Sequence, residues 1–155
     1  MRPNTLWLLL FAGLTFNNYL AQAPVEVPAQ SKGAGAPHNY NISSAQKELK
    51  NPIPYSGASA GRGKNAFLSR CAHCHGPNAD GKGNLAAVIG VKPPDFHKPG
   101  VLSARTDGEL FFIIGTGSEN MPSEKITRVT AKQRWDIVNY LRSVEGKTPA
   151  DGRKH

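Results

Sequence analysis

The residues with the most specific chemistry in this sequence are two cysteines and a histidine in the run Cys71-Ala72-His73-Cys74-His75. Two thiols three positions apart lie on the same side of a helical turn, so both can reach the two vinyl groups along one edge of a porphyrin. His75 follows directly and can place an imidazole nitrogen on the porphyrin iron. The C-x-x-C-H spacing is the attachment signature of c-type haem, so it predicts one haem c bound covalently through Cys71 and Cys74, with His75 on the iron.

Three other interpretations of the cysteines explain the sequence less well. A thioredoxin-type redox disulfide opens a helix after a strand, whereas here we expect a helix before the motif and a glycine-rich loop after it. A structural zinc site needs four ligands, and His38, His97 and His155 form no pair. A plain structural disulfide leaves His75 without a role. We expect His73, between the cysteines, to face solvent.

A second iron ligand should come from elsewhere in the chain. Apart from Met1, the sequence has one methionine, Met121, in the polar loop over residues 115–122. Pro122 fixes the backbone directly after it. A thioether sulfur opposite histidine raises the haem potential because a soft donor favours ferrous iron. We therefore expect Met121 as the sixth ligand; ligation by His97, which would lower the potential, and an empty site, which would admit small molecules, are the alternatives.

Three segments with helical spacing should position these groups. The first covers about residues 59–71 and places Gly63 and Phe67 on one face, where the glycine lets another helix cross closely. The other two begin at capping boxes, over residues 106–109 and 130–133. The second should end at a glycine after its apolar run, and the third carries apolar residues at spacings of three and four.

The fold class that follows is all-α, because no stretch alternates convincingly enough for a strand. Loops as long as the helices are unusual in a small domain, and three short helices alone would give a marginal core. We expect the haem to fill that core, with the three main short helices and long loops wrapped around it. Candidate residues for its apolar shell are Phe67, Phe96, Phe111, Phe112 and Trp135.

The segments outside this region predict export. Residues 1–23 combine a positive start, a short apolar run and small residues before Pro24, which indicates either a cleaved signal peptide or a retained membrane anchor. Both place the rest of the chain in the periplasm or on another extracytoplasmic face. Residues 24–58 are rich in Pro, Gly and Ala and are interpreted as a linker, with a short helix expected near residues 43–50. The haem domain is assigned to residues 59–145 and a polar tail to residues 146–155.

About 85 residues, from Ala60 to Val144, resemble a monohaem class I cytochrome c of the exported bacterial respiratory type. The likeness rests on Gly63, Phe67 and the C-x-x-C-H run, on Asn120-Met121-Pro122, and on the run from Trp135 to Leu141. It implies the class I fold, in which the first and last helices cross near a small residue, here Gly63 against Tyr140 or Leu141. It also implies a hydrogen bond from the other His75 ring nitrogen to a carbonyl in the region of Pro93 or Pro94.

The resemblance implies an electron carrier and not an enzyme, since His75 and Met121 together leave no open position on the iron. The expected partners are redox proteins: a quinol-oxidising complex and a terminal oxidase or reductase. A fixed cytochrome subunit of such a membrane complex is the alternative to a monomeric carrier, and a haem sensor or peroxidase is a third interpretation. Residues 59–145 hold 12 Lys and Arg against 8 Asp and Glu, a weakly basic balance. Nucleic-acid binding has no support, because there is neither a basic cluster nor a recognition motif.

Overall fold

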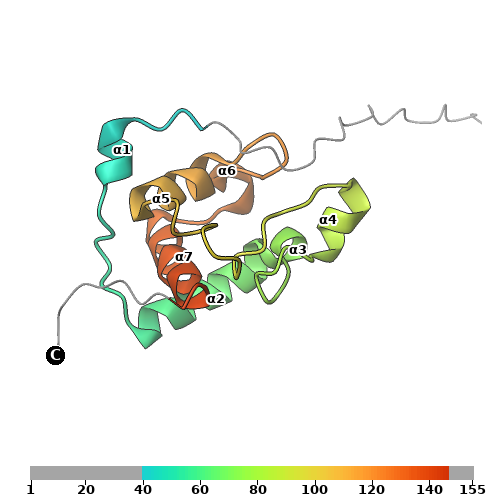
Figure 1. Ribbon diagram of the computed structural model, residues 1–155, viewed down its shortest axis with the longest axis horizontal. Helices are drawn as coiled ribbons and strands as arrows, with labels where there is room; N and C mark the ends of the chain where they lie inside the picture. Colours follow the sequence, from blue (N-terminus) through green and yellow to red (C-terminus); the bar gives the residue numbers. More distant parts are fainter. Residues whose placement is uncertain (1–39, 147–155) are drawn as a thin grey trace, which may run out of the picture. The chain divides into compact units, whose positions relative to one another are not determined.

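Helices account for the regular structure of residues 40–146, the part of the chain that the computed structural model describes (Figure 1). Within these residues there is no strand, and Ser118 and Met121 form an isolated bridge. The all-α fold is therefore confirmed. In chain order the helices are α1 (Ser44–Glu48), α2 (Gly57–Arg70), α3 (Ala72–His75), α4 (Asn84–Ile89), α5 (Asp107–Thr116), α6 (Glu124–Thr127) and α7 (Ala131–Val144).

The starts of the longer helices follow from side chains that satisfy free backbone N–H groups. Thr106 and Thr130 cap α5 and α7 through the boxes that the sequence predicts, and Ser43 caps α1 in the same way. Helix α2 begins two residues earlier than expected. Its cap is Ser56, which accepts from the backbone of Ser59, and this serine pair is a weaker sequence signal than the usual box with Glu or Gln.

Three short helices, α3, α4 and α6, are absent from the sequence-based expectation. Each has four to six residues, too few to show an apolar period. Helices α4 and α6 both end on a left-handed residue, Gly90 and Arg128 respectively. They lie between the three main helices, in stretches for which the sequence predicts no regular structure.

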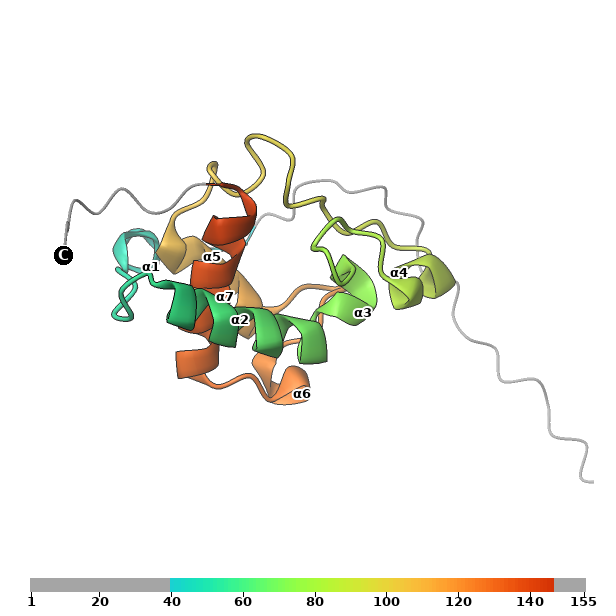
Figure 2. The same cartoon turned by 90° about the horizontal axis from the view of Figure 1, so that it is seen from below.

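Helices α2 and α7 cross, as Figure 2 shows. Gly63 lies at their contact. A Cβ on Gly63 would meet the backbone carbonyl of Asp136 and lie 2.9 Å from Cβ of Tyr140. The expected contact of Gly63 with Tyr140 is confirmed, and Asp136 lies still closer. Around this crossing lies a core of apolar side chains that includes Phe67, Leu102, Ile137, Val138 and Leu141.

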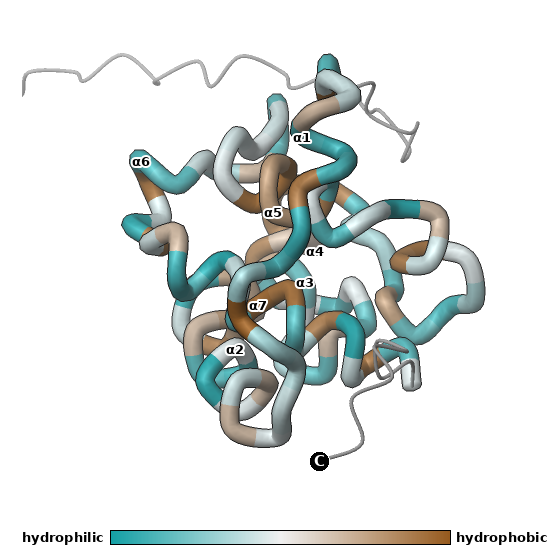
Figure 3. The backbone as a smooth tube through the Cα atoms, turned by 90° about the vertical axis from the view of Figure 1, so that its left-hand side faces the viewer, coloured by the Kyte–Doolittle hydropathy of each residue, from teal (hydrophilic) through white to brown (hydrophobic). Residues whose placement is uncertain are grey.

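Helix α5 supplies the next part of the core. Figure 3 shows most of it as hydrophobic, and its Leu110 and Ile114 are buried. The ring of Phe111 stacks on the indole of Trp135 in α7, with centroids 4.0 Å apart and planes 15° apart. Stacked aromatic pairs of this kind fix one helix on another beyond simple area burial.

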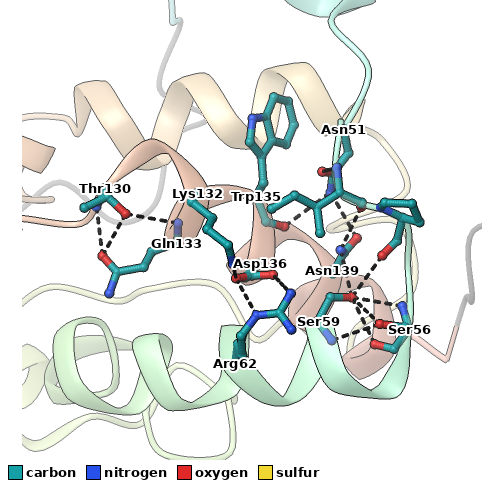
Figure 4. A network of polar contacts seen from close by, with 12 residues as sticks. Asn51, Ser56, Ser59, Arg62, Thr130, Lys132, Gln133, Trp135, Asp136 and Asn139 are labelled. Carbon is teal, nitrogen blue, oxygen red and sulfur yellow. Dashed lines mark hydrogen bonds and ion pairs between the residues drawn. The ribbon is translucent and has the colours of Figure 1, made fainter.

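The segment before α2 packs against the domain, as Figure 4 shows. Asn51 donates to the backbone carbonyl of Trp135 at 3.2 Å and to the side chain of Asn139 at 3.0 Å. Asn139 in turn donates to the carbonyl of Ile53 and to the hydroxyl of Ser59. Over residues 40–58, therefore, the segment interpreted as a linker is tied to α7. The expected signal or anchor at residues 1–23, the rest of the linker and the tail after residue 146 lie outside the described residues.

Candidate functional site

The C-x-x-C-H run comprises the residue that ends α2 and the single-turn helix α3. Cys71 ends α2, where its N–H donates to the carbonyl of Phe67 at 2.8 Å. Its own carbonyl accepts from the N–H groups of Cys74 and His75, at 3.2 and 2.9 Å. The two thiols are free, with no disulfide between them. The backbone of the run is thus helical, the geometry that the predicted attachment of both cysteines needs.

A glycine-rich loop folds back over this turn and holds it. The N–H of Gly81 donates to the carbonyl of His75 at 2.8 Å, and the N–H of Gly83 donates to that of Cys74 at 3.1 Å. A Cβ on Gly83 would collide with the backbone of His73 and Cys74, so only glycine allows so close an approach. The loop thereby satisfies carbonyls at the end of α3 that would otherwise lack partners.

Two aromatic rings surround the imidazole of His75. Phe96 stacks on it with centroids 5.1 Å apart and planes 17° apart, and Phe67 lies tilted against it at 6.2 Å. Phe96 is held in place by its N–H, which donates to the carbonyl of Ala79 at 3.0 Å. Ala79 is completely buried and has a positive φ of 62°, an uncommon conformation for alanine. The rings therefore orient His75 and keep water from it.

The electrostatics of His75 suit a metal ligand. Burial among these rings lowers its pKa to about 4, so the imidazole is neutral at pH 7 and has a lone pair to donate. Its Nδ1 is buried and has no hydrogen-bond partner among the described residues. A buried polar atom without a partner is costly unless a bound group satisfies it.

The expected hydrogen bond from His75 to a carbonyl near Pro93 or Pro94 is not formed. Both carbonyls do lie beside the site, but they face Gly81, where a Cβ would be 2.5 Å and 3.1 Å from them. The backbone of Gly81 thus lies between these carbonyls and the turn that carries His75. The segment with Pro93 and Pro94 therefore lies beside the site as expected, whereas the predicted hydrogen bond to His75 is absent among the described residues.

The pKa values of the two cysteine thiols are raised, whereas those of redox-active thiols are lowered. Burial, and to a lesser degree the neighbouring Cys74, raises the pKa of Cys71 to about 11. Burial also raises the pKa of Cys74. Reactive C-x-x-C motifs of the thioredoxin type have lowered thiol pKa values. Over residues 40–146, moreover, no three His, Cys, Asp or Glu side chains gather as a metal site of the zinc type would require.

Met121 belongs to a different segment, the loop between α5 and α6. Its backbone pairs with Ser118 in both directions, at 2.8 and 3.2 Å, and its side chain is half-buried. Gly117 closes the loop with a φ of 69°, and a Cβ there would collide with the carbonyl of Met121. The structure thus joins Cys71, Cys74 and His75 on one turn, and it holds Met121 in a loop closed by backbone hydrogen bonds.

The other histidines of the described residues are poor candidates for the iron. His97 is exposed, and its Nε2 lies 2.7 Å from the carbonyl of Asn78. His73 is exposed, as expected, and lines a surface pocket of about 550 Å³ that does not include His75. The alternative ligation by His97 therefore loses support.

The predicted aromatic shell is largely present. Phe67 and Trp135 belong to the buried core, and Phe96 and Phe111 pack against it, whereas Phe112 is half-buried outside it. Sequence reasoning missed the residues that shape the loop, Ala79, Gly81 and Gly83. The glycines at positions 76, 81 and 83 indicate a tight loop after the motif, but they do not predict which carbonyls the loop contacts.

A family model for cytochrome c matches residues 60–145 of the chain. The chain belongs to the cytochrome c family. Membership implies covalently bound haem c, and the site described above fits it: two free thiols lie on one turn, beside a neutral, buried imidazole whose Nδ1 has no partner. The all-α fold with long loops is the fold that the resemblance to class I cytochromes c implies.

Several individual proteins are similar to this chain. A protein named as the cytochrome c subunit of the cytochrome bc1 complex in Corynebacterium diphtheriae is 30% identical over 129 residues, covering 81% of this chain and 42% of that protein. The Mycobacterium leprae protein of the same name is 29% identical, covering 76% and 36%. The chain thus spans about two fifths of the length of these curated relatives. The crystal structure of cytochrome cL from Methylophaga aminisulfidivorans has 23% identity and a TM-score of 0.44, covering 61% of this chain and 59% of that one.

Among residues 40–146, none of the helices has the length and apolar character needed to cross a membrane.

Proposed function

We propose that this protein transfers single electrons through one haem c, bound by thioether bonds to Cys71 and Cys74 and ligated on the iron by His75 and Met121. The observation that carries the proposal is the pairing of two free thiols on one helical turn with the imidazole of His75, whose buried Nδ1 has no hydrogen-bond partner among the described residues. When bound, the haem supplies an iron that accepts and releases one electron while its axial ligands stay in place.

The residues of this chain do three things in that role. Cys71 and Cys74 present their sulfurs from a turn whose backbone is held by Gly81 and Gly83. Phe96 fixes the plane of the His75 ring and excludes water from it. The apolar rings around the site keep the local dielectric low, which stabilises the neutral imidazole and limits reorganisation when the charge changes.

We propose a respiratory complex as the partner. The relatives are named as cytochrome c subunits of the cytochrome bc1 complex, which supports a quinol-oxidising complex as electron donor and favours a fixed subunit over a freely diffusing carrier. The signal peptide or membrane anchor predicted from the sequence of residues 1–23 supports a periplasmic or other extracytoplasmic site. Detergent-free fractionation separates the two modes, because a carrier stays in the soluble fraction and a subunit co-purifies with membrane proteins.

The spectrum of the oxidised protein tests the ligand assignment. We expect a near-infrared methionine–iron band, haem that resists acid-acetone extraction, and slow carbon monoxide binding by the reduced form. Met121→Ala should abolish the band and open the iron to carbon monoxide. A variant with an unaltered spectrum would remove Met121 from the site, and rapid carbon monoxide binding by the natural protein would support a sensor or peroxidase instead.

A further inference from the structure

Arg134 is a nearly buried cation that the haem site described above does not use. It belongs to α7, and its side chain is 14% exposed. Its Nη2 pairs with Oε2 of Glu124 at 2.9 Å, and its Cζ lies 4.0 Å from the ring centroid of Phe111. Its Nη1 also lies 3.5 Å from the carbonyl of Phe111. One guanidinium thus contacts both α5 and α6.

The contacts of Arg134 lie at the two ends of the loop that carries Met121. Helix α5 ends at Thr116 and α6 begins at Glu124, so residues 117–123 form the loop that carries Met121. At the α5 end, Arg134 lies against Gly115, where a Cβ would collide with its Nη1. At the α6 end it pairs with the first residue of the helix. The guanidinium therefore holds both ends of the loop to α7.

Arginine suits this position for a physical reason. A planar guanidinium can lie flat on an aromatic ring while its edge pairs with a carboxylate, and a lysine ammonium cannot do both. The other side of the contact is rigid, because Phe111 is itself stacked on Trp135. The α5 end of the loop is thus fixed to a stacked aromatic pair, and the α6 end is held through the ion pair with Glu124.

We propose that Arg134 is a positioning residue that holds the Met121 loop in the conformation in which the sulfur can reach the iron. The inference rests on the proposed function, since it needs Met121 as a ligand. Loosening the ends of the loop raises the entropy that iron–sulfur bonding must overcome, so external ligands compete better. The iron potential should fall as methionine is displaced, because a soft donor no longer favours ferrous iron.

Arg142 provides a matched control. It lies on the same helix with 12% exposure, and its guanidinium bonds Asp107 and the carbonyls of Leu102 and Arg105, at 2.8 to 2.9 Å. It therefore holds the segment before α5, with none of these bonds to residues 117–123. Arg142→Ala should reduce stability as Arg134→Ala does, without loosening Met121.

The experiment measures imidazole affinity of the oxidised holoprotein and the near-infrared band. We expect Arg134→Ala to bind imidazole about tenfold more tightly or better, since about 1.4 kcal/mol of lost loop restraint corresponds to that factor. Arg134→Lys should lie between it and the natural protein. Glu124→Gln, at a side chain 42% exposed, removes only one anchor and should give a smaller shift in the same direction, even if Arg134→Ala fails to fold.

Two results would overturn the role of Arg134: unchanged imidazole affinity in Arg134→Lys and Glu124→Gln, or an equal gain in Arg142→Ala. Met121→Ala separates this failure from that of the proposed function. If Met121→Ala opens the iron and the Arg134 variants do not, only the positioning role is wrong. If Met121→Ala leaves the spectrum unchanged, the ligand assignment and the role of Arg134 fail together.

Discussion

Asn51 and Asn139, 88 residues apart in the chain, are joined by a side-chain amide hydrogen bond of 3.0 Å. Asn139 is 2% exposed, and its own amide N–H groups are shared between the carbonyl of Ile53 and the hydroxyl of Ser59. A buried amide is stable only when such partners are present, so this asparagine ties the segment before α2 to the centre of the helix crossing.

Replacing Asn139 should therefore be costly. In Asn139→Leu the carbonyl of Ile53 loses its side-chain donor and the amide of Asn51 loses one of its two acceptors. A buried group left unsatisfied costs about 1–3 kcal/mol. Denaturant unfolding of the holoprotein measures the loss. Asn65→Ala, on the exposed face of α2, is the control and should change stability by less than about 0.5 kcal/mol. Equal effects of the two variants would contradict the importance of this network.

The helix crossing gives a second prediction. In Gly63→Ala the new methyl group meets the backbone of Asp136, which cannot rotate away, so α2 and α7 must separate. Overpacking of this kind costs about 1–3 kcal/mol. Gly61→Ala, in the same helix with nothing within 4 Å of its Cβ position, should instead stabilise by up to about 1 kcal/mol. Thermal unfolding of both holoproteins decides the matter, and a stabilised Gly63→Ala would show that the crossing is looser than described.

The sequence predicts the parts of this fold that local physics determines. Thr106 and Thr130 predict the starts of their helices. In each case the threonine hydroxyl accepts from the backbone N–H of the Glu or Gln three residues later, and the side chain of that residue accepts from the threonine N–H. Gly63 predicts the crossing of the first and last helices, because a glycine on a helix face lets another helix approach closely. The C-x-x-C-H run predicts a helical turn, since residues three positions apart lie on the same side of a helix.

What sequence reasoning missed depends on contacts between distant segments. Phe96 stacks on His75 while its N–H donates to the carbonyl of Ala79, a residue at positive φ, and the sequence gives no sign of either contact. The segment with Pro93 and Pro94 lies near the turn that carries His75, as expected, but its carbonyls contact Gly81 and not the His75 ring. The role of Asn51 is equally invisible, because its partner lies near the other end of the domain.

A third prediction concerns acid. Burial alone would raise the pKa of Asp136, but hydrogen bonds from Arg62 and Lys132 outweigh it and hold the pKa below the ordinary value of 3.8 (Figure 4). A lowered carboxyl pKa adds stability that is fully present at neutral pH and is lost as pH falls below about 4, through the folded pKa. Asp136→Asn should therefore be less stable than the natural protein at pH 7, and the difference should shrink at pH 3.

The measurement is unfolding by urea at several pH values, on the holoprotein. Glu48→Gln, at an exposed position in α1, is the control for general charge effects. A stability gap between the natural protein and Asp136→Asn that stays constant down to pH 3 would mean that the carboxylate is not selectively stabilised by its two cations.

The last prediction separates the two functions of Thr106. Its hydroxyl accepts from the N–H of Glu109, which caps α5, and donates to the carbonyl of Lys47 at 2.7 Å, which fastens the end of α1. Thr106→Ala loses both bonds. Thr130→Ala loses a cap of the same kind on α7 but no bond to α1. Each lost cap should cost about 1 kcal/mol, and hydrogen exchange should report the further difference.

Thr106→Ser keeps the hydroxyl and should behave nearly as the natural protein, which excludes a steric cause. In Thr106→Ala we expect faster amide exchange over α1 and residues 49–53, because their attachment to α5 is weakened. Thr130→Ala should leave that segment as protected as before, at a similar loss in overall stability. Equal exchange over α1 in the two alanine variants would mean that Asn51 and the Lys47–Glu109 ion pair hold the segment without Thr106.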